Sequence, residues 1–260
     1  MDYPTLSRTG WNDPVASTNY DDHGMLVEQG KRRTVTEVIA RMALPSGPPG
    51  DVYNFGVYTG GGLKALVDGF RTNNVRIGHI WGFDSFRGLP DSDLRRHSTS
   101  GQAASWKAGK LNAAEQLSKV MGSKAFRFSE LRKHIIRGIG TPNATLVPGF
   151  FNESLPALAP RLRNRMRPAL LVDIDCDIYE GTLEGLEFLF KGGLLLPGYS
   201  TVYYDDWQSE AHGEAKAHHQ LARKHGAVWR NLQLSAACLA SGRSCGRQRL
   251  FQLVSINRPA

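Results

Sequence analysis

Hydrophobic residues along this chain follow two patterns: short unbroken apolar runs, and stretches in which apolar side chains recur every three or four positions. The first pattern is typical of strands buried on both faces, and the second of amphipathic helices. We expect strands at residues 51–58, 79–83, 144–151, 169–175, 194–204, 228–234 and 250–256. We expect helices at residues 31–44, 63–70, 110–121, 129–137, 180–190 and 209–225. Their alternation favours an α/β fold, with a mostly parallel seven-stranded sheet and helices on both faces.

Two stretches lack such a period. Residues 1–30 are rich in Asp, Asn, Gly, Pro and Thr, which predicts an N-terminal arm ordered by contact with the body or with a partner subunit. We therefore divide the chain into an N-terminal arm and helix at 1–45 and one domain at 46–260. Within that domain, residues from about 88–125 form a variable insert, and its polar stretch at 88–102 is typical of a lid, a binding loop or a disordered segment. The arm is also our reason to expect a homo-oligomer.

Composition is that of an ordinary soluble globular protein, with 41% hydrophobic and 22% charged residues in 260 positions. No apolar run approaches the ~20 residues that span a bilayer. The first ten residues lack the charged and apolar regions of a secretory signal. The cysteines, Cys176, Cys238 and Cys245, lack metal-ligand spacing. Because reduced cysteines suit the cytoplasm, we expect a cytoplasmic protein without a membrane partner.

The net charge of +8 is concentrated in residues 87–167, where basic side chains are in surplus. Such a surplus could attract an anionic partner such as nucleic acid. The stretch lacks the interleaved aromatic residues on which bases stack. We therefore favour a solvated helical surface and do not expect nucleic acid as a partner.

Acidic residues end two consecutive apolar runs. Asp173, Asp175 and Asp177 end the first run, and Asp205 and Asp206 end the second. A single Asp in such a place usually caps a turn or a helix. Because ligands bind at the carboxyl ends of parallel strands, the whole set favours a functional cluster. Three of these carboxylates could hold Mg²⁺, which lowers the pKa of a bound alcohol and orients it.

A glycine loop follows the first predicted strand, from Gly56 to Gly62. It matches neither the dinucleotide fingerprint nor a phosphate-binding loop. Asp84, at the end of the second strand, stands where nucleotide-binding α/β folds grip ribose hydroxyls. A tight structural turn and a capping Asp would explain the same residues. Together they favour an adenosyl ligand without a polyphosphate, a description that S-adenosylmethionine fits.

Four motifs occur in order between residues 51 and 224. They are Phe83-Asp-Ser-Phe-Arg-Gly-Leu-Pro90, Val147-Pro-Gly-Phe-Phe-Asn-Glu-Ser-Leu-Pro156, Asp175-Cys-Asp-Ile-Tyr-Glu-Gly-Thr182 and Tyr204-Asp-Asp-Trp207. This set resembles the macrocin O-methyltransferase family, metal-dependent sugar O-methyltransferases of natural-product biosynthesis. The resemblance implies a Rossmann-like class I methyltransferase fold, S-adenosylmethionine as methyl donor and Mg²⁺ as essential metal.

The resemblance also implies roles for individual residues. Asp175, Asp205 and Asp206 match the family's metal ligands, Asp177 matches its proposed general base, and Asp84 matches its ribose-binding acid. The residues that we expect on the cofactor side are Asn54, Gly56, Tyr58, Gly60, Gly61, Asp84, Ser85, Gly149 and Phe150. The family has an acid at the position of Asn54, so one polar contact to the methionine end of the cofactor differs here.

His212 follows the Asp-Asp-Trp motif closely enough to be a second base or an acceptor contact, although a histidine on a helix surface is the simpler interpretation. The predicted function is methyl transfer to a hydroxyl of a sugar or of a glycosylated small molecule. Three alternatives stay open. The acceptor could be a catechol, whose neighbouring hydroxyls also chelate Mg²⁺. It could be RNA or another polyanion. The chain could also be a non-catalytic binder of an adenosyl ligand, as Asn54 suggests.

Overall fold

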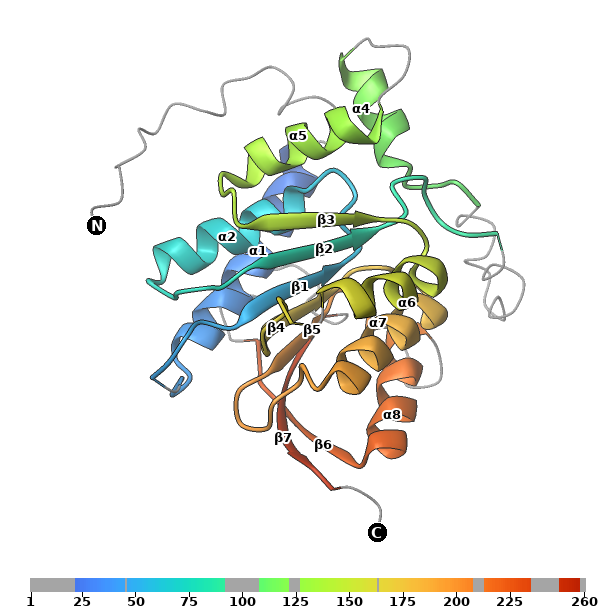
Figure 1. Cartoon of the computed structure of the whole chain (residues 1–260). Coiled ribbons are helices and arrows are strands. Elements are labelled where there is room, and N and C mark those ends of the chain that lie inside the picture. The colour runs from blue at the N-terminus through green and yellow to red at the C-terminus, as the bar shows by residue number, and fades with distance from the viewer. Residues whose placement is uncertain are drawn as a thin grey trace.

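A computed structural model describes residues 22–44, 46–91, 108–121, 127–162, 164–207, 213–234 and 248–257. Its centre is a seven-stranded sheet in the order β3-β2-β1-β4-β5-β7-β6 (Figure 1). The strands are β1 (Asp51–Phe55), β2 (Ile80–Asp84), β3 (Ala144–Pro148), β4 (Ala169–Ile174), β5 (Thr201–Tyr204), β6 (Ala227–Asn231) and β7 (Arg249–Ile256). The predicted α/β architecture is therefore confirmed.

The sheet has one point at which the strand order reverses. The pairs among β1 to β5 are parallel, and β7 runs antiparallel to both β5 and β6. The chain builds outward from β1 through β2 to β3, and then returns to place β4 on the other side of β1. In open α/β sheets the crevice at such a reversal, outside the carboxyl ends of the strands, is the usual ligand site.

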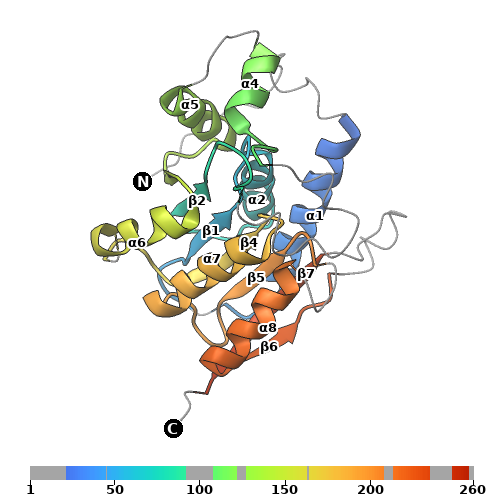
Figure 2. The same cartoon turned by 90° about the vertical axis from the view of Figure 1, so that its right-hand side faces the viewer.

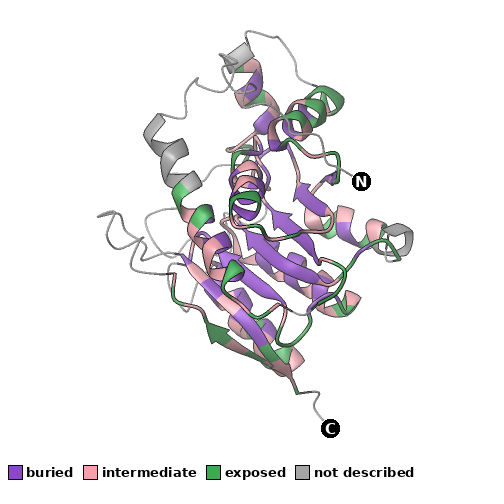
Figure 3. Ribbon diagram, turned by 90° about the vertical axis from the view of Figure 1, so that its left-hand side faces the viewer, coloured by how far each residue is buried: buried purple, intermediate pink, exposed green. Residues whose placement is uncertain are grey.

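Helices cover both faces of the sheet (Figures 1 and 2). One face carries α1 (Asp22–Ala40), α2 (Gly61–Thr72), α4 (Ala113–Met121) and α5 (Phe128–Ile139). The other carries α6 (Phe151–Leu162), α7 (Tyr179–Gly192) and α8 (Gly213–His225). Alternate strand residues supply the two cores, as in β1, where Val52 faces the first helical layer and Tyr53 and Phe55 face the second. Figure 3 shows the central strands buried between these layers.

Several predicted elements differ from the structure. Helix α1 begins at Asp22, inside the predicted arm, and packs through the buried Val35 and Ile39. Helix α6 was not predicted, and the third strand, expected at residues 144–151, ends at Pro148, just before α6 begins at Phe151. Helix α5 begins at Phe128 with Arg127 as its N-cap, whereas Ser129 is the more usual capping residue. Within the part of the chain that the structure describes, no helix has the length and hydrophobicity to cross a membrane.

Candidate active site

The carboxyl ends of β4 and β5 bring three of the predicted acids together. Ile174 and Tyr204, the last residues of these strands, are partners in the parallel register, so the residues that follow them emerge side by side. Carboxylate oxygens of Asp175, Asp205 and Asp206 all lie within 4.8 Å of one another. The strand-end pattern thus predicted a real juxtaposition. The role of these residues as metal ligands stays a prediction.

Asp177, the predicted base, lies beside this cluster. Its backbone is left-handed, with φ of 63°, which is uncommon for a residue other than glycine. Burial raises the pKa of Asp177 well above its usual range, and a hydrogen bond with Asp206 and the charge of that residue raise it further. A carboxyl with a raised pKa accepts a proton more readily near neutral pH, which is the property that a general base needs.

Two adjacent basic residues of α1 enter the acidic cluster. Arg32 lies 3.3 Å from Asp173 (Nε to Oδ2) and 2.6 Å from Asp175 (Nη2 to Oδ2). Lys31 Nζ lies 3.0 Å from Asp205 Oδ2. Burial alone would lower the pKa of Arg32, but the neighbouring carboxylates outweigh it and hold that pKa well above its ordinary value. The guanidinium therefore stays charged in the protein interior.

These two cations also affect Asp205. Burial would raise the pKa of Asp205, but Arg32, Lys31 and the hydrogen bond from the Tyr203 hydroxyl lower it below its ordinary value. The Tyr203 hydroxyl donates to Oδ1 of Asp205 at 2.5 Å. Sequence reasoning missed both cations, because Lys31 belongs to a basic run with Arg32 and Arg33 that reads as a solvated helix face.

Asp173 is the exception among the predicted acids, because it is buried inside the sheet. Its Oδ2 accepts hydrogen bonds from Arg32 Nε and from Asn54 Nδ2, the latter at 2.9 Å. Asn54 and Asp173 are register partners on β1 and β4, so the contact follows from strand pairing. Oδ1 of each residue is buried without a hydrogen-bond partner. Asn54 is thus buried inside the sheet against Asp173, and its contact with the cofactor stays a prediction.

Glu214 at the start of α8 is a further buried carboxyl. Its Oε2 accepts the backbone N–H of Asp206 at 3.0 Å, and its Oε1 has no hydrogen-bond partner. Burial raises the pKa of Glu214 well above its usual range, and Asp206, Asp177 and Asp175 raise it further. A glutamate on a helix usually faces solvent, and that simple interpretation is wrong here.

The donor set fits a hard divalent cation. Such ions prefer carboxylate oxygens, and three carboxylates are already gathered. Among the described residues at this edge, acids outnumber the cations Lys31 and Arg32, so positive charge is still lacking. Two of the three ligands already contact a cation, however, because Arg32 lies 2.6 Å from Asp175 Oδ2 and Lys31 lies 3.0 Å from Asp205 Oδ2.

The glycine loop connects the cofactor side to the acids. Gly56 has φ of 98°, and a Cβ there would lie 1.9 Å from the carbonyl oxygen of Asp175. Asp84 Oδ2 accepts the backbone N–H groups of Val57 and Tyr58 at 2.9 and 2.8 Å. Burial raises the pKa of Asp84, while these hydrogen bonds oppose the rise. Asp84 therefore fixes the loop, and its contact with a ribose stays a prediction.

The other predicted cofactor residues lie along the same rim. Gly60, with φ of 91°, is the N-cap of α2, and Gly61 is the first residue of that helix. Ser85 Oγ donates to Gly88 O at 2.7 Å. Gly149 N donates to Asp84 O at 3.0 Å. Next to it, the ring of Phe150 lies under the Arg87 guanidinium, 5.0 Å from its centroid. His212, the second predicted catalytic residue, lies outside the described residues.

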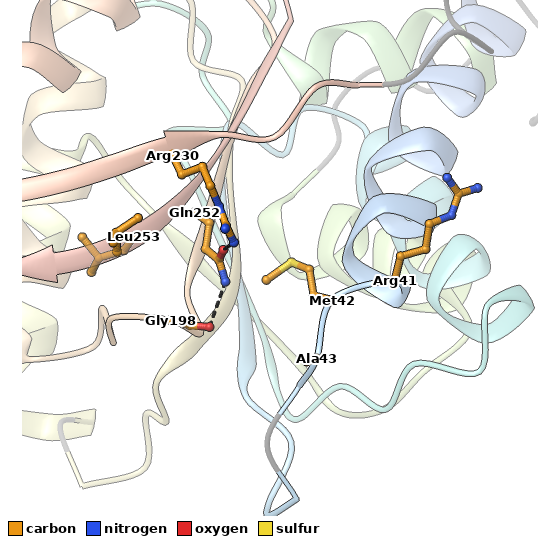
Figure 4. A pocket seen from close by; sticks show the side chains of 8 residues that line it. Arg41, Met42, Ala43, Gly198, Arg230, Gln252 and Leu253 are labelled. Atoms are coloured by element: carbon orange, nitrogen blue, oxygen red, sulfur yellow. Dashed lines mark hydrogen bonds between the residues drawn. The ribbon is translucent and has the colours of Figure 1, made fainter.

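A hollow of about 470 Å³ lies at the opposite end of β5 (Figure 4). Its lining residues are Arg41, Met42, Ala43, Gly198, Arg230, Gln252, Leu253 and Val254. In Figure 4 the Arg230 side chain extends to Gln252, to which it is hydrogen-bonded, while the Arg41 guanidinium points away from both. None of the predicted site residues lines this hollow, so the candidate active site is the acidic rim.

Solved structures share this fold. The O-methyltransferase NovP superposes with a TM-score of 0.52 at 19% identity, over 89% of this chain and 81% of NovP. The calicheamicin methyltransferase CalS11 gives 0.52 at 22% identity, over 95% of this chain and 87% of CalS11. The seven-stranded sheet and these neighbours define the class of protein, a Rossmann-like class I methyltransferase fold.

The chain belongs to the macrocin O-methyltransferase family, since the family model described as Macrocin-O-methyltransferase (TylF) matches residues 22–230. The resemblance inferred from the four motifs is thereby confirmed. A relative from Streptomyces olivaceus, 8-demethyl-8-(2,3-dimethoxy-alpha-L-rhamnosyl)-tetracenomycin-C 4'-O-methyltransferase, is 26% identical over 70% of this chain and 62% of its own length. Another from Streptomyces niveus, demethyldecarbamoylnovobiocin O-methyltransferase, is 27% identical over 61% of this chain and 53% of its own length. The chain thus spans less than two thirds of either relative.

Proposed function

We propose that this protein is an S-adenosylmethionine-dependent O-methyltransferase that acts, with Mg²⁺, on a hydroxyl of a sugar or of a glycosylated small molecule. The observation that carries the proposal is the convergence of Asp175, Asp205 and Asp206 within 4.8 Å at the strand ends. The names of the two relatives support the acceptor class, because one describes methylation on a rhamnosyl compound. Both relatives are natural-product O-methyltransferases by name.

Methyl transfer needs an acceptor oxygen held in line with the sulfonium and a group that takes its proton. A bound Mg²⁺ would lower the pKa of the acceptor hydroxyl and fix its orientation. Asp175, Asp205 and Asp206 would hold the ion, and Asp177 would take the proton. S-adenosylmethionine would supply the methyl group as a sulfonium, whose carbon–sulfur bond would break with its electron pair on sulfur as the acceptor oxygen bonds to the methyl carbon. The hydrogen bond between Asp177 and Asp206, which places Asp177 beside the proposed metal ligands, supports its role as base.

The basic side chains of residues 87–167 do not change this assignment. Described members such as Arg132, Lys133 and Arg137 occur on α5, whereas Lys31 and Arg32, which contact the acids, belong to α1. A polyanion acceptor would need those charges beside the reacting atoms. A catechol acceptor stays compatible with the same chemistry, because its neighbouring hydroxyls can share one cation.

The test is release of S-adenosylhomocysteine with glycosylated acceptors and with free catechol, before and after metal removal with excess EDTA. We expect turnover of at least one glycosylated acceptor, loss of activity in EDTA and recovery when Mg²⁺ is added back. Full activity in EDTA would remove the metal from the proposal. If catechol is the only acceptor that is methylated, the acceptor class is a catechol and not a sugar. If the cofactor binds but no acceptor is methylated, a non-catalytic binding protein is favoured.

A further inference from the structure

Three consecutive basic residues of α1 have very different surroundings. The side chain of Arg32 is 0% exposed, that of Lys31 is 19% exposed and that of Arg33 is 68% exposed. Arg33 Nε lies 3.3 Å from Glu37 on the same helix, away from the acids. Arg32 is thus part of the interior, Arg33 belongs to the surface, and Lys31 stands at the boundary between them.

The Lys31 ammonium contacts the Asp205 oxygen that a metal ion would need as a ligand. The Tyr203 hydroxyl donates to Oδ1 of Asp205, and the Lys31 ammonium contacts Oδ2 at 3.0 Å. A divalent ion approaches a carboxylate oxygen to about 2.0–2.6 Å. It cannot share Oδ2 with an ammonium at hydrogen-bond distance without strong repulsion between the two cations.

We propose that Lys31 is an internal cation that occupies the Asp205 ligand position, and that a divalent ion binding with Asp175 and Asp206 displaces it. This inference rests on the proposed function, because it concerns the same metal site. Lys31 can move because it is partly exposed and its long aliphatic stem can turn the ammonium into water. Arg32 cannot move in this way, because it bridges Asp173 and Asp175 in the interior.

The charges around the site favour this exchange. Carboxylate oxygens of Asp175, Asp205 and Asp206 lie within 4.8 Å of one another, close enough for their charges to repel, and the Lys31 ammonium contacts Asp205. A divalent ion held between Asp205 and Asp206 would relieve that repulsion, because it brings two charges closer to these acids. In the metal-free protein Lys31 therefore neutralises part of the cluster, and binding of the ion releases its contact with Asp205.

The experiment measures Mn²⁺ binding to the metal-free full chain by calorimetry. We compare the unaltered protein with three variants, Lys31→Met, Arg33→Met and Asp206→Asn. Arg33→Met is the control, because it removes the same charge two residues further along the same helix. Lys31→Met should bind Mn²⁺ about 10-fold more tightly than the unaltered protein does, because no charge-assisted hydrogen bond to Asp205 has to break in the variant. Arg33→Met should stay within about 2-fold of the unaltered protein, since an exposed pair contributes little. Asp206→Asn should bind more weakly.

If Lys31→Met binds Mn²⁺ no more tightly than the unaltered protein while Asp206→Asn binds it more weakly, the displacement of Lys31 is wrong. The metal site itself would still be supported. Absence of Mn²⁺ binding in every form would overturn both the displacement and the metal in the proposed function.

Amine labelling of the unaltered protein gives a second readout. Acetylation of Lys31 should speed up several-fold when Mn²⁺ is added, relative to Lys64, which pairs with Asp68 elsewhere. An unchanged rate at Lys31 would contradict the proposal.

Discussion

At the scale of single residues, Gly56 connects the cofactor loop to the acidic rim. Its φ of 98° is strained for any residue with a side chain, and a Cβ would lie 1.9 Å from the Asp175 carbonyl oxygen and 2.6 Å from its carbon. Those atoms are backbone, so no side chain can turn aside to make room. At Gly61, five positions along, a Cβ would have nothing within 4 Å. The same substitution should therefore have opposite consequences at these two glycines.

We predict that Gly56→Ala lowers the free energy of unfolding by about 3 kcal/mol or more, because left-handed strain of about 1–3 kcal/mol adds to the backbone clash. Gly61→Ala should stay within about 0.5 kcal/mol or be slightly stabilising, since alanine favours a helix. Urea unfolding of both variants measures the difference. Similar losses in the two variants would contradict this account of Gly56.

At the scale of elements, α7 and α8 are joined by an ionic cluster on the second face of the sheet. Glu187 of α7 lies 2.7 Å from Lys224 Nζ and 2.7 Å from His225 Nε2, both on α8. Burial would raise the pKa of Glu187, but hydrogen bonds from His225, Lys224 and Lys191 outweigh it and lower that pKa to about 2. The ionised carboxylate therefore helps to fix α8, whose first turn carries Glu214 beside the acidic rim.

Because the pKa of Glu187 is lower in the folded than in the unfolded chain, its stabilisation is complete above pH 4.5 and is lost as the pH falls toward about 2. We predict that Glu187→Gln lowers the free energy of unfolding at neutral pH by about 1 kcal/mol, the upper range for exposed pairs, because several cations share one carboxylate. The difference from the unaltered protein should shrink as the pH falls through this window. Urea unfolding at several pH values measures it.

Glu115→Gln is the matched control, because Glu115 makes an exposed pair with Lys119 within one helix. Its effect should be smaller than that of Glu187→Gln at neutral pH. A Glu187→Gln difference that stays constant from neutral to acidic pH would show that the carboxylate charge is not its cause.

At the scale of the whole molecule, the candidate site is assembled from segments far apart in the chain. Helix α1, the ends of β4 and β5, and the start of α8 all meet at the rim where the strand order reverses. Such a site exists only in the folded protein. A ligand that binds there stabilises the folded state alone, in proportion to its concentration relative to its Kd.

We predict that S-adenosylhomocysteine at about 100 times its Kd raises the free energy of unfolding by about 2.7 kcal/mol. ATP at the same concentration should have no comparable effect, because the glycine loop lacks the Lys and Ser or Thr of a phosphate-binding loop. Thermal unfolding with each ligand measures the shift. Stabilisation by ATP equal to that by S-adenosylhomocysteine would contradict the assignment of the loop to an adenosyl ligand without a polyphosphate.

Local sequence patterns were enough to predict the seven strands of the sheet and the position of the acids at two strand ends. These features depend on local periodicity and on the rule that parallel strands share one carboxyl edge. It could therefore be predicted that Asp175 lies close to Asp205 and Asp206. The helix predicted at residues 180–190 corresponds to α7, whose C-cap Gly193 is left-handed.

Only the tertiary structure decided which charges oppose those acids. Arg32 and Asp173 are 141 positions apart, and Lys31 and Asp205 are 174 apart. A run of basic residues on a helix carries no local signal that distinguishes the buried member from the exposed one. Which of these basic residues is buried depends on how α1 packs over the sheet. A guanidinium can be buried only where carboxylates lie close enough to pair with it.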